Sequence, residues 1–486
     1  MAKKIFDNKL LIIILLIAAF LRLYKIPSYM EFLGDQGRDM LLVRRFLAKG
    51  DLMFIGPQTS VGNIYLGPWY YYLIAPALLL SGFNPVGPAI FIALLGVAAV
   101  WLVYRVGREW LNKTTGLIAA LLMAFSPVII YYNIFSWNPN VMGFFALLAI
   151  YLLGEIWLKK DFKKIPWLAL SLAMILNSHY LGLLVFPVVS LFLFLSFWAI
   201  KDNGKEKKLL GKNIVWAGIV FFLFMLPLVL FDLKHGGANF QAFKAFFINR
   251  EETVNFRLYK GISNFLQVLG QLGANLLVRK DSWPWSFLFL PFLLIGLWQA
   301  RKNKLLLLPG AWLFVGLFGL SNYKQAVYAH YFGFLWPAVI LILAVGLKKL
   351  WPWSLGAAGI VSLLMFSQWH GLRPPVNQLA RSQNVAQFIL SSAAEEEFSL
   401  ALIAKNNYDA PYRYYLENQN PRLVDLHEQM TSQLFVICEP WGIEDCNPLG
   451  HSRWEIAAFG RADLAGKWQI SGIDVFKLVH SHEKID

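Results

Sequence analysis

Apolar residues dominate the chain and come in long runs separated by short polar segments. Most of the runs reach or approach the ~17–25 residues that a helix needs to cross a lipid bilayer. The pattern therefore predicts an α-helical membrane protein with many spans. The twelve runs are 10–24, 67–82, 86–104, 114–132, 141–158, 165–178, 180–200, 213–231, 283–299, 305–320, 331–347 and 353–369.

Basic residues lie mainly in the short loops between these runs, and their spacing predicts a topology. Two runs separate each consecutive pair of basic clusters from Arg105 onward, so all these clusters can be cytoplasmic. Three runs separate Lys4 from Arg105, so one of the three should not span. The run 67–82 is short, contains Pro76 and begins with aromatic residues, which favours an interfacial helix. We expect about 11 spans in the plasma membrane, with a cytoplasmic N-terminus and an extracytoplasmic C-terminus.

Composition and charge agree with this class. Of the 486 residues, 57% are hydrophobic and only 15% are charged, whereas soluble domains carry about 25% charged residues. The net charge of +15 is uneven, because the first 370 residues carry +20 and the remaining residues carry −5. The positive excess follows the positive-inside rule and not the stripe of a nucleic-acid-binding surface, so no nucleic-acid partner is expected.

The C-terminal part, 371–486, is less apolar and predicts a small extracytoplasmic α/β domain after a membrane domain at 1–370. Its strand-like stretches are 398–404, 434–438 and 473–479. Both cysteines of the chain, Cys438 and Cys446, lie here. A disulfide between them fits an oxidising compartment, and two unpaired thiols fit a non-oxidising one, so both alternatives stay open.

The first outer loop holds the leading candidate for chemistry. Polar residues at membrane depth are rare, and Asp35 precedes a predicted amphipathic helix, 37–48, that we expect to lie on the membrane surface. Asp35 fits the N-cap of that helix. It equally fits a carboxylate at the lipid–water boundary beside Arg38, able to accept a proton from a hydroxyl. Asp39, on the same helix, is a candidate for orienting substrate.

Further candidates lie in the other outer loops and at the adjoining ends of the runs. Those for orienting substrate are Tyr70, Asn138, His179, Tyr180 and His330, and those for binding donor phosphate or sugar are Arg38, Lys324, Tyr331, Lys234 and Arg250. Each has a plainer alternative. Asn138-Pro139 can start a helix, a lone histidine is often a turn residue, and a cation can be solvated.

Known cofactor motifs are missing, whereas four other features recur in a fixed order. Neither GxxxxGK[ST] nor GxGxxG after a strand occurs, and no His/Cys cluster has metal-ligand spacing. The four features are Asp35-Gln36-Gly37-Arg38 with a helix to Gly50-Asp51, Gly67-Pro68-Trp69-Tyr70-Tyr71, residues 106–108 with 116–127, and Tyr331 six residues before Pro337. Together they resemble the GT-C membrane glycosyltransferases, in particular the family-39-like branch of protein O-mannosyltransferases and aminoarabinose lipid A transferases.

The resemblance implies a glycosyltransferase that moves a sugar from a polyprenyl-phosphate donor to an acceptor hydroxyl on the outer face, with inversion. Asp35 would be the general base, and the acceptor would be a lipid, a glycan or a protein. Gln36 replaces the family's second acidic residue, Gly67 replaces a phosphate-binding lysine, and Asn138 replaces an acidic residue of the second outer loop. No cofactor is firmly implied, and these departures disfavour the alternative of a divalent metal, Mg²⁺ or Mn²⁺.

Two alternative functions stay open. A lipid-linked oligosaccharide transporter, or flippase, predicts ionisable residues at mid-span, which these runs almost lack. An O-antigen ligase or polymerase typically relies on arginines in a large late loop. Arg250 and Arg257 keep that alternative open.

Overall fold

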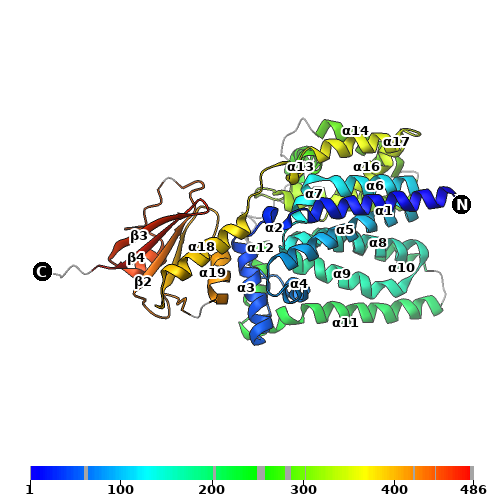
Figure 1. Cartoon of the computed structure of the whole chain (residues 1–486). Helices are drawn as coiled ribbons and strands as arrows, with labels where there is room; N and C mark the ends of the chain where they lie inside the picture. The colour runs from blue at the N-terminus through cyan, green and yellow to red at the C-terminus, as the bar shows by residue number, and fades with distance from the viewer. Residues whose placement is uncertain are drawn as a thin grey trace. The chain divides into compact units, whose positions relative to one another are not determined.

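The chain forms two compact units in the computed structural model (Figure 1), which describes residues 2–59, 64–200, 204–248, 258–279, 286–300, 303–419, 422–443 and 445–481. The membrane unit comprises Met1–Tyr24 and Gly50–Pro374, and the C-terminal unit comprises Lys25–Lys49 and Pro375–Asp486. The C-terminal unit resumes at Pro375, close to the domain boundary predicted after residue 370. Lys25–Lys49, however, packs with the C-terminal residues, whereas the sequence analysis had placed it in the N-terminal domain.

The regular secondary structure of the membrane unit is mainly helical in its described residues. Its α-helices are α1 (Ala2–Leu23), α4 (Trp69–Leu80), α5 (Val86–Trp110), α6 (Lys113–Phe125), α7 (Pro127–Tyr132), α8 (Met142–Lys159), α9 (Ile165–Ser178), α10 (Phe186–Trp198), α11 (Gly204–Lys234), α12 (Ala238–Ile248), α13 (Leu258–Val278), α14 (Ser286–Ala300), α15 (Lys304–Ser321), α16 (Trp336–Lys348) and α17 (Ser354–Phe366). Its 3₁₀ helices are η1 (Asn138–Val141), η2 (Phe162–Lys164), η3 (Tyr180–Val185), η5 (Ala329–Phe332) and η6 (His370–Leu372).

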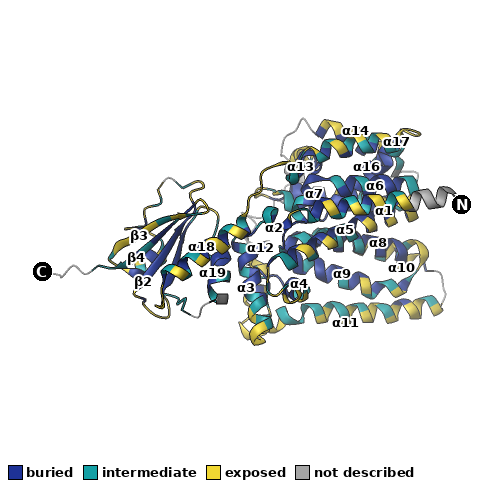
Figure 2. Ribbon diagram, in the orientation of Figure 1, coloured by how far each residue is buried: buried dark blue, intermediate teal, exposed yellow. Residues whose placement is uncertain are grey.

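Length and exposed apolar side chains identify this unit as multi-pass. Five described helices are long and apolar enough to cross a bilayer, namely Val86–Trp110, Asn138–Lys159, Tyr180–Trp198, Gly204–Lys234 and Lys304–Ser321. Figure 2 shows α11 intermediate or exposed along most of its length, and its large apolar side chains, such as Trp216 and Phe222, are half exposed. Lipid covers such a surface in a membrane protein. Shorter apolar helices include α4, so the count of 11 spans stays a prediction.

The predicted run 114–132 is two helices, because a proline interrupts it. Pro127 has no N–H, so the carbonyl of Met123 loses the donor that a continuous helix would supply. Arg22 of α1, whose side chain is fully buried, fills that role by donating from Nη2 to the Met123 carbonyl at 3.1 Å. Its other bonds reach the carbonyl of Ala124 at 3.1 Å and Asn133 Oδ1 at 3.0 Å. The cation therefore holds together the end of α6 and the end of α7.

The C-terminal unit is an α/β fold with a four-stranded sheet in the order β1-β2-β4-β3. Its elements are α2 (Ile26–Tyr29), α3 (Gly34–Lys49), α18 (Gln378–Ser392), β1 (Ser399–Ile403), α19 (Ala410–Gln419), β2 (Gln433–Cys438), α20 (Trp454–Phe459), β3 (Ala462–Ile470) and β4 (Ile473–His480). β1 and β2 are parallel, and β4 runs antiparallel to both β2 and β3.

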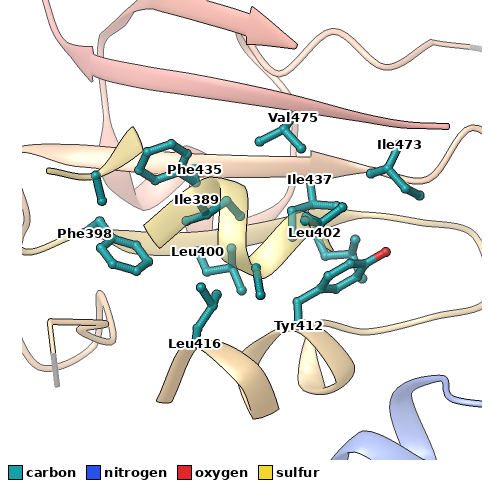
Figure 3. Packing of buried hydrophobic residues seen from close by; sticks show 13 residues of the cluster. Ile389, Phe398, Leu400, Leu402, Tyr412, Leu416, Phe435, Ile437, Ile473 and Val475 are labelled. Atoms are coloured by element: carbon teal, nitrogen blue, oxygen red, sulfur yellow. The ribbon is translucent and has the colours of Figure 1, made fainter. Parts of the chain in front are cut away.

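Helices cover both faces of this sheet. On one face, Ile389 of α18 and Leu416 of α19 pack against Leu402 and Ile437 of β1 and β2 (Figure 3). On the other face, Phe459 of α20 packs against the opposite side chains of the same strands. Burial on both faces explains why every residue of β1 and β2 is buried and why both sequences are apolar after their first residue.

Several expectations for this unit are confirmed and one strand was missed. The three predicted strands are β1, β2 and β4. Of the two alternatives left open for the cysteines, the structure has the disulfide between Cys438 and Cys446. β3, an edge strand with the sequence ADLAGKWQI, was not predicted because its first six residues include none of the β-branched or aromatic residues typical of strands. The amphipathic helix is present as α3, but it packs along α19, and Met40 and Val43 are buried in the protein.

Candidate active site

Asp35 lies in the first turn of α3, three residues before Arg38 and on the same face of the helix. Its Oδ1 accepts a hydrogen bond from Arg38 Nη1 at 3.0 Å, and its side chain is 40% exposed. Arg38 also donates from Nη2 to Oδ1 of Asp39 at 2.7 Å, and the Asp39 side chain is fully buried. The arginine therefore bridges an accessible and a buried carboxylate.

Other groups cap the start of α3. Gln36 Oε1 accepts the backbone N–H of Leu33 at 2.9 Å, as the third helical residue does in a capping box. Asn407 Oδ1 accepts the backbone N–H of Gly34 at 2.8 Å. Since α3 begins at Gly34, Asp35 is inside the helix and not at its N-cap. The capping alternative therefore does not account for Asp35.

Tyr408, which no sequence pattern indicated, contacts the same carboxylate. Its hydroxyl donates to Asp35 Oδ1 at 2.8 Å. Burial raises the pKa of the Tyr408 hydroxyl well above its usual value, with Arg38 opposing and Asp35 adding to the increase, so the hydroxyl keeps its proton. Two glycines allow this close packing, because a Cβ at Gly34 would overlap the Tyr408 ring and a Cβ at Gly37 would overlap the backbone of Pro411.

Asn407 and Tyr408 follow strand β1, and Glu439 follows the neighbouring parallel strand β2. Glu439 Oε1 accepts from Asn407 Nδ2 at 2.7 Å and from the Tyr412 hydroxyl at 2.8 Å. These bonds fix the loop that carries Tyr408. Ligand and catalytic groups in α/β folds commonly lie beyond the carboxyl ends of parallel strands, and this rule is the signal that could have found the loop.

The basic side of α3 also meets the C-terminal residues. Arg44 donates to the backbone carbonyl of Tyr414 at 2.8 Å, and its guanidinium lies 3.6 Å from Glu417. Arg45 forms a closer ion pair with Glu417, at 3.0 Å. Hydrogen bonds therefore join α3 to α19 or to the loop before it at both ends, and the helix is held as a rigid part of its unit.

A second group of predicted residues comes together in the membrane unit. We call His179, Tyr180, Tyr323, His330 and Tyr331 the histidine–tyrosine cluster. The His179 ring centroid lies 5.1 Å from that of Tyr331 and 5.8 Å from that of His330. The hydroxyls of Tyr180 and Tyr323 are 2.7 Å apart. Four of the five were candidates from sequence, and Tyr323 was missed.

His179 is both a member of this cluster and a turn residue. Its Nδ1 accepts the backbone N–H of Leu181 at 3.2 Å, which places the ring proton on Nε2. Burial, with a smaller contribution from His330, lowers the pKa of His179 to about 3. The ring is therefore neutral at physiological pH and cannot supply a positive charge to a phosphate.

Asn138 and Tyr70 use their polar atoms within the protein. Asn138 Nδ2 donates to the backbone carbonyl of Ser178 at 2.7 Å, and the Tyr70 hydroxyl lies 2.7 Å from Ser136 Oγ. Both side chains are buried. Asn138 also begins η1, as the helix-start alternative expects. The Asn138 side chain therefore stabilises the turn at His179 through the carbonyl of the preceding residue, Ser178.

Of the candidate cations other than Arg38, two lie within the described residues and two lie outside them. Lys324 and Lys234 are exposed, and Arg250 and Arg257 lie outside the described residues. Within the described part of the chain, no three His, Cys, Asp or Glu side chains gather to hold a metal ion.

Comparison with known proteins agrees with this architecture. Residues 66–231 match the family of dolichyl-phosphate-mannose-protein mannosyltransferases. No curated protein sequence matches the chain. Its fold is similar to that of ArnT from Cupriavidus metallidurans bound to undecaprenyl phosphate, with a TM-score of 0.63, 13% identity and 98% of each chain covered.

A second solved structure is more distant. The archaeal oligosaccharyltransferase AglB from Archaeoglobus fulgidus, in complex with an inhibitory peptide and a dolichol-phosphate, gives a TM-score of 0.53 at 13% identity. The match covers 89% of this chain and 69% of that one. At such identities the structures show the fold. Together with the family match, they confirm the resemblance predicted from the sequence.

Proposed function

Residues 66–231 match the mannosyltransferase family and the fold is similar to that of ArnT, so we propose that this chain is a membrane glycosyltransferase that transfers a sugar from a polyprenyl-phosphate donor to an acceptor hydroxyl, with inversion. The acceptor is a lipid, a glycan or a protein. The observation that carries the proposal is the Asp35 carboxylate, which is 40% exposed and whose Oδ1 is held by Arg38 and Tyr408. An accessible carboxylate in a fixed orientation is what a general base requires.

In the proposed step, the acceptor oxygen bonds to the anomeric carbon of the sugar while the bond from that carbon to the phosphate oxygen breaks. The acceptor proton passes to Asp35, and polyprenyl phosphate leaves with the bonding electrons. Arg38 is engaged with two carboxylates, so we assign it to orienting Asp35 and not to the phosphate. We keep Lys324 and Tyr331 as proposed ligands of the donor phosphate, because a cation and an O–H donor stabilise the charge that develops on it.

We propose that transfer takes place on the extracytoplasmic side. The positive-inside distribution of lysine and arginine supports this orientation, and so does the disulfide between Cys438 and Cys446. A reporter fused after Gly371 should be active only outside the cytoplasm, and one fused at Lys113 only inside. A Lys113 reporter active outside the cytoplasm would contradict the topology.

The test compares Asp35→Asn with wild type in a strain that lacks the gene. Membranes of that strain are the source of acceptor, and their lipid fraction should accumulate the unused polyprenyl-phosphate sugar if the proposal is correct. Mass spectrometry should show this donor consumed and a sugar added to envelope lipid, glycan or protein when wild type is restored. Asp35→Asn keeps the shape of the side chain, so its thermal stability should change little. Its transfer rate should fall about 10²–10⁴-fold, the usual contribution of a general base. A stable variant with wild-type turnover would remove Asp35 from the mechanism.

A further inference from the structure

The first turn of α3 is shaped by a loop that lies 373 residues later in the chain. Tyr408 donates to Asp35 Oδ1, while Asn407 caps the adjacent Gly34 amide. Gly34 and Gly37 are the positions at which a side chain would overlap this loop and the start of α19. The Asp35 motif and the Asn407–Tyr408 loop are therefore packed directly against each other within one compact unit.

The Tyr408 hydroxyl acts as a permanent donor. The charged groups around it are Arg38, Asp35 and Asp39, and burial keeps the phenol protonated. Its bond to Oδ1 and the bond from Arg38 converge on one carboxylate oxygen, at 2.8 and 3.0 Å. Two donors on one oxygen fix the plane of the carboxylate, and Arg38 alone would leave more freedom of rotation.

We propose that Tyr408 is a positioning residue for Asp35, so that the C-terminal unit contributes directly to sugar transfer. This inference rests on the proposed function, because it assigns Tyr408 a role through the general base. It gives the C-terminal unit a role in the chemical step itself. The loop after β1 orients the base, and Glu439 after β2 orients the loop.

The experiment uses Tyr408→Phe in the full-length protein, with Tyr415→Phe as the matched control. Tyr415 lies on α19 in the same unit, its ring packs on Phe32, and it makes no hydrogen bond to a carboxylate among the described residues. Turnover is measured with the lipid fraction of the deletion strain as donor and its membranes as acceptor. Thermal unfolding of both variants is followed in the same detergent.

Tyr408→Phe should lower kcat about 10–100-fold while KM for the donor lipid changes little, because misorientation acts on the chemical step. Tyr415→Phe should leave both unchanged. In the Asp35→Asn background, adding Tyr408→Phe should cause no further loss.

Wild-type turnover in Tyr408→Phe would overturn the inference. An equal fractional loss with and without Asp35 would do the same, because Tyr408 would then act independently of the base. If the wild-type protein itself transfers no sugar from the lipid fraction, the proposed function is rejected, whatever the Tyr408→Phe variant does. An active wild type with an unaffected Tyr408→Phe variant removes only the role of Tyr408.

Discussion

The two groups of candidate residues are held by different forces. In the C-terminal unit, Asp35 is partly exposed and its orientation depends on hydrogen bonds from a cation and a phenol. In the membrane unit, the histidine–tyrosine cluster depends on ring packing and on hydrogen bonds. The His179 ring packs near Tyr331 and accepts a backbone N–H, and the hydroxyls of Tyr180 and Tyr323 are hydrogen-bonded to each other. A base must stay hydrated and ionised to accept a proton, whereas recognition of a lipid-linked group relies mainly on shape. The difference predicts that the two groups respond differently to mutation, pH and salt.

The largest effect is expected where packing around Asp35 is tightest. Gly37→Leu places a side chain against the backbone of Pro411, which cannot move without displacing α19. Overpacking of this kind costs about 3 kcal/mol at the upper end of its usual range. We expect a lower melting temperature and a fall in transfer rate together. Gly211→Ala is the control, because a Cβ there meets open space. An unchanged melting temperature for Gly37→Leu would contradict the described contact between α3 and α19.

The disulfide provides the next test within the C-terminal unit. Cys446→Ser opens a loop between residues separated by 8 positions. The chain-entropy model assigns roughly 2.6 kcal/mol to a loop of this length. We expect the free energy of unfolding of this unit to fall by that amount, while thermal unfolding of the membrane unit is unaffected. Equal stability with and without reductant in wild type would exclude a stabilising role.

The membrane unit should instead respond to pH through His179. The folded pKa of about 3 lies below the unfolded value of 6.5, so the unfolded state binds a proton that the folded state does not. Stability should therefore fall as pH drops below about 6.5, by roughly 2 kcal/mol at pH 5 for this one group. His179→Gln should remove that share of the pH dependence of thermal unfolding. If the variant kept the full dependence, another group would have to account for it.

The smallest effect is expected at the exposed ion pair between Arg45 and Glu417. The Arg45 side chain is 46% exposed, so screening by solvent limits the pair. Arg45→Ala should lower stability by less than about 1 kcal/mol, and the loss should disappear at high salt. A larger or salt-independent loss would show that α3 depends on this residue more than its exposure suggests.

Local patterns account for what could be predicted, and long-range packing for what could not. Apolar runs, the α3 pattern and three strands follow from periodicity within a few residues. The interruption at Pro127 was visible in the sequence but was read as a continuous span. Tyr408 could not be assigned, because its contact with Asp35 joins residues 373 apart and depends on the packing of α3 against α19. The glycines at 34 and 37 indicate that another part of the chain packs closely against α3, without indicating which residues.

The buried Arg22 has a consequence for how the protein is made. Its guanidinium bonds to Met123, Ala124 and Asn133, which are synthesised more than 100 residues after it. Until those residues enter the bilayer, the only one of its described hydrogen-bond partners already made is the carbonyl of Ala18, one turn earlier in α1. A cation in that situation moves toward the headgroups. We therefore expect nascent α1 to lie close to the headgroups at first and to move deeper into the bilayer once α6 and α7 are inserted. Insertion of α1 would then be complete only after α7 has been made.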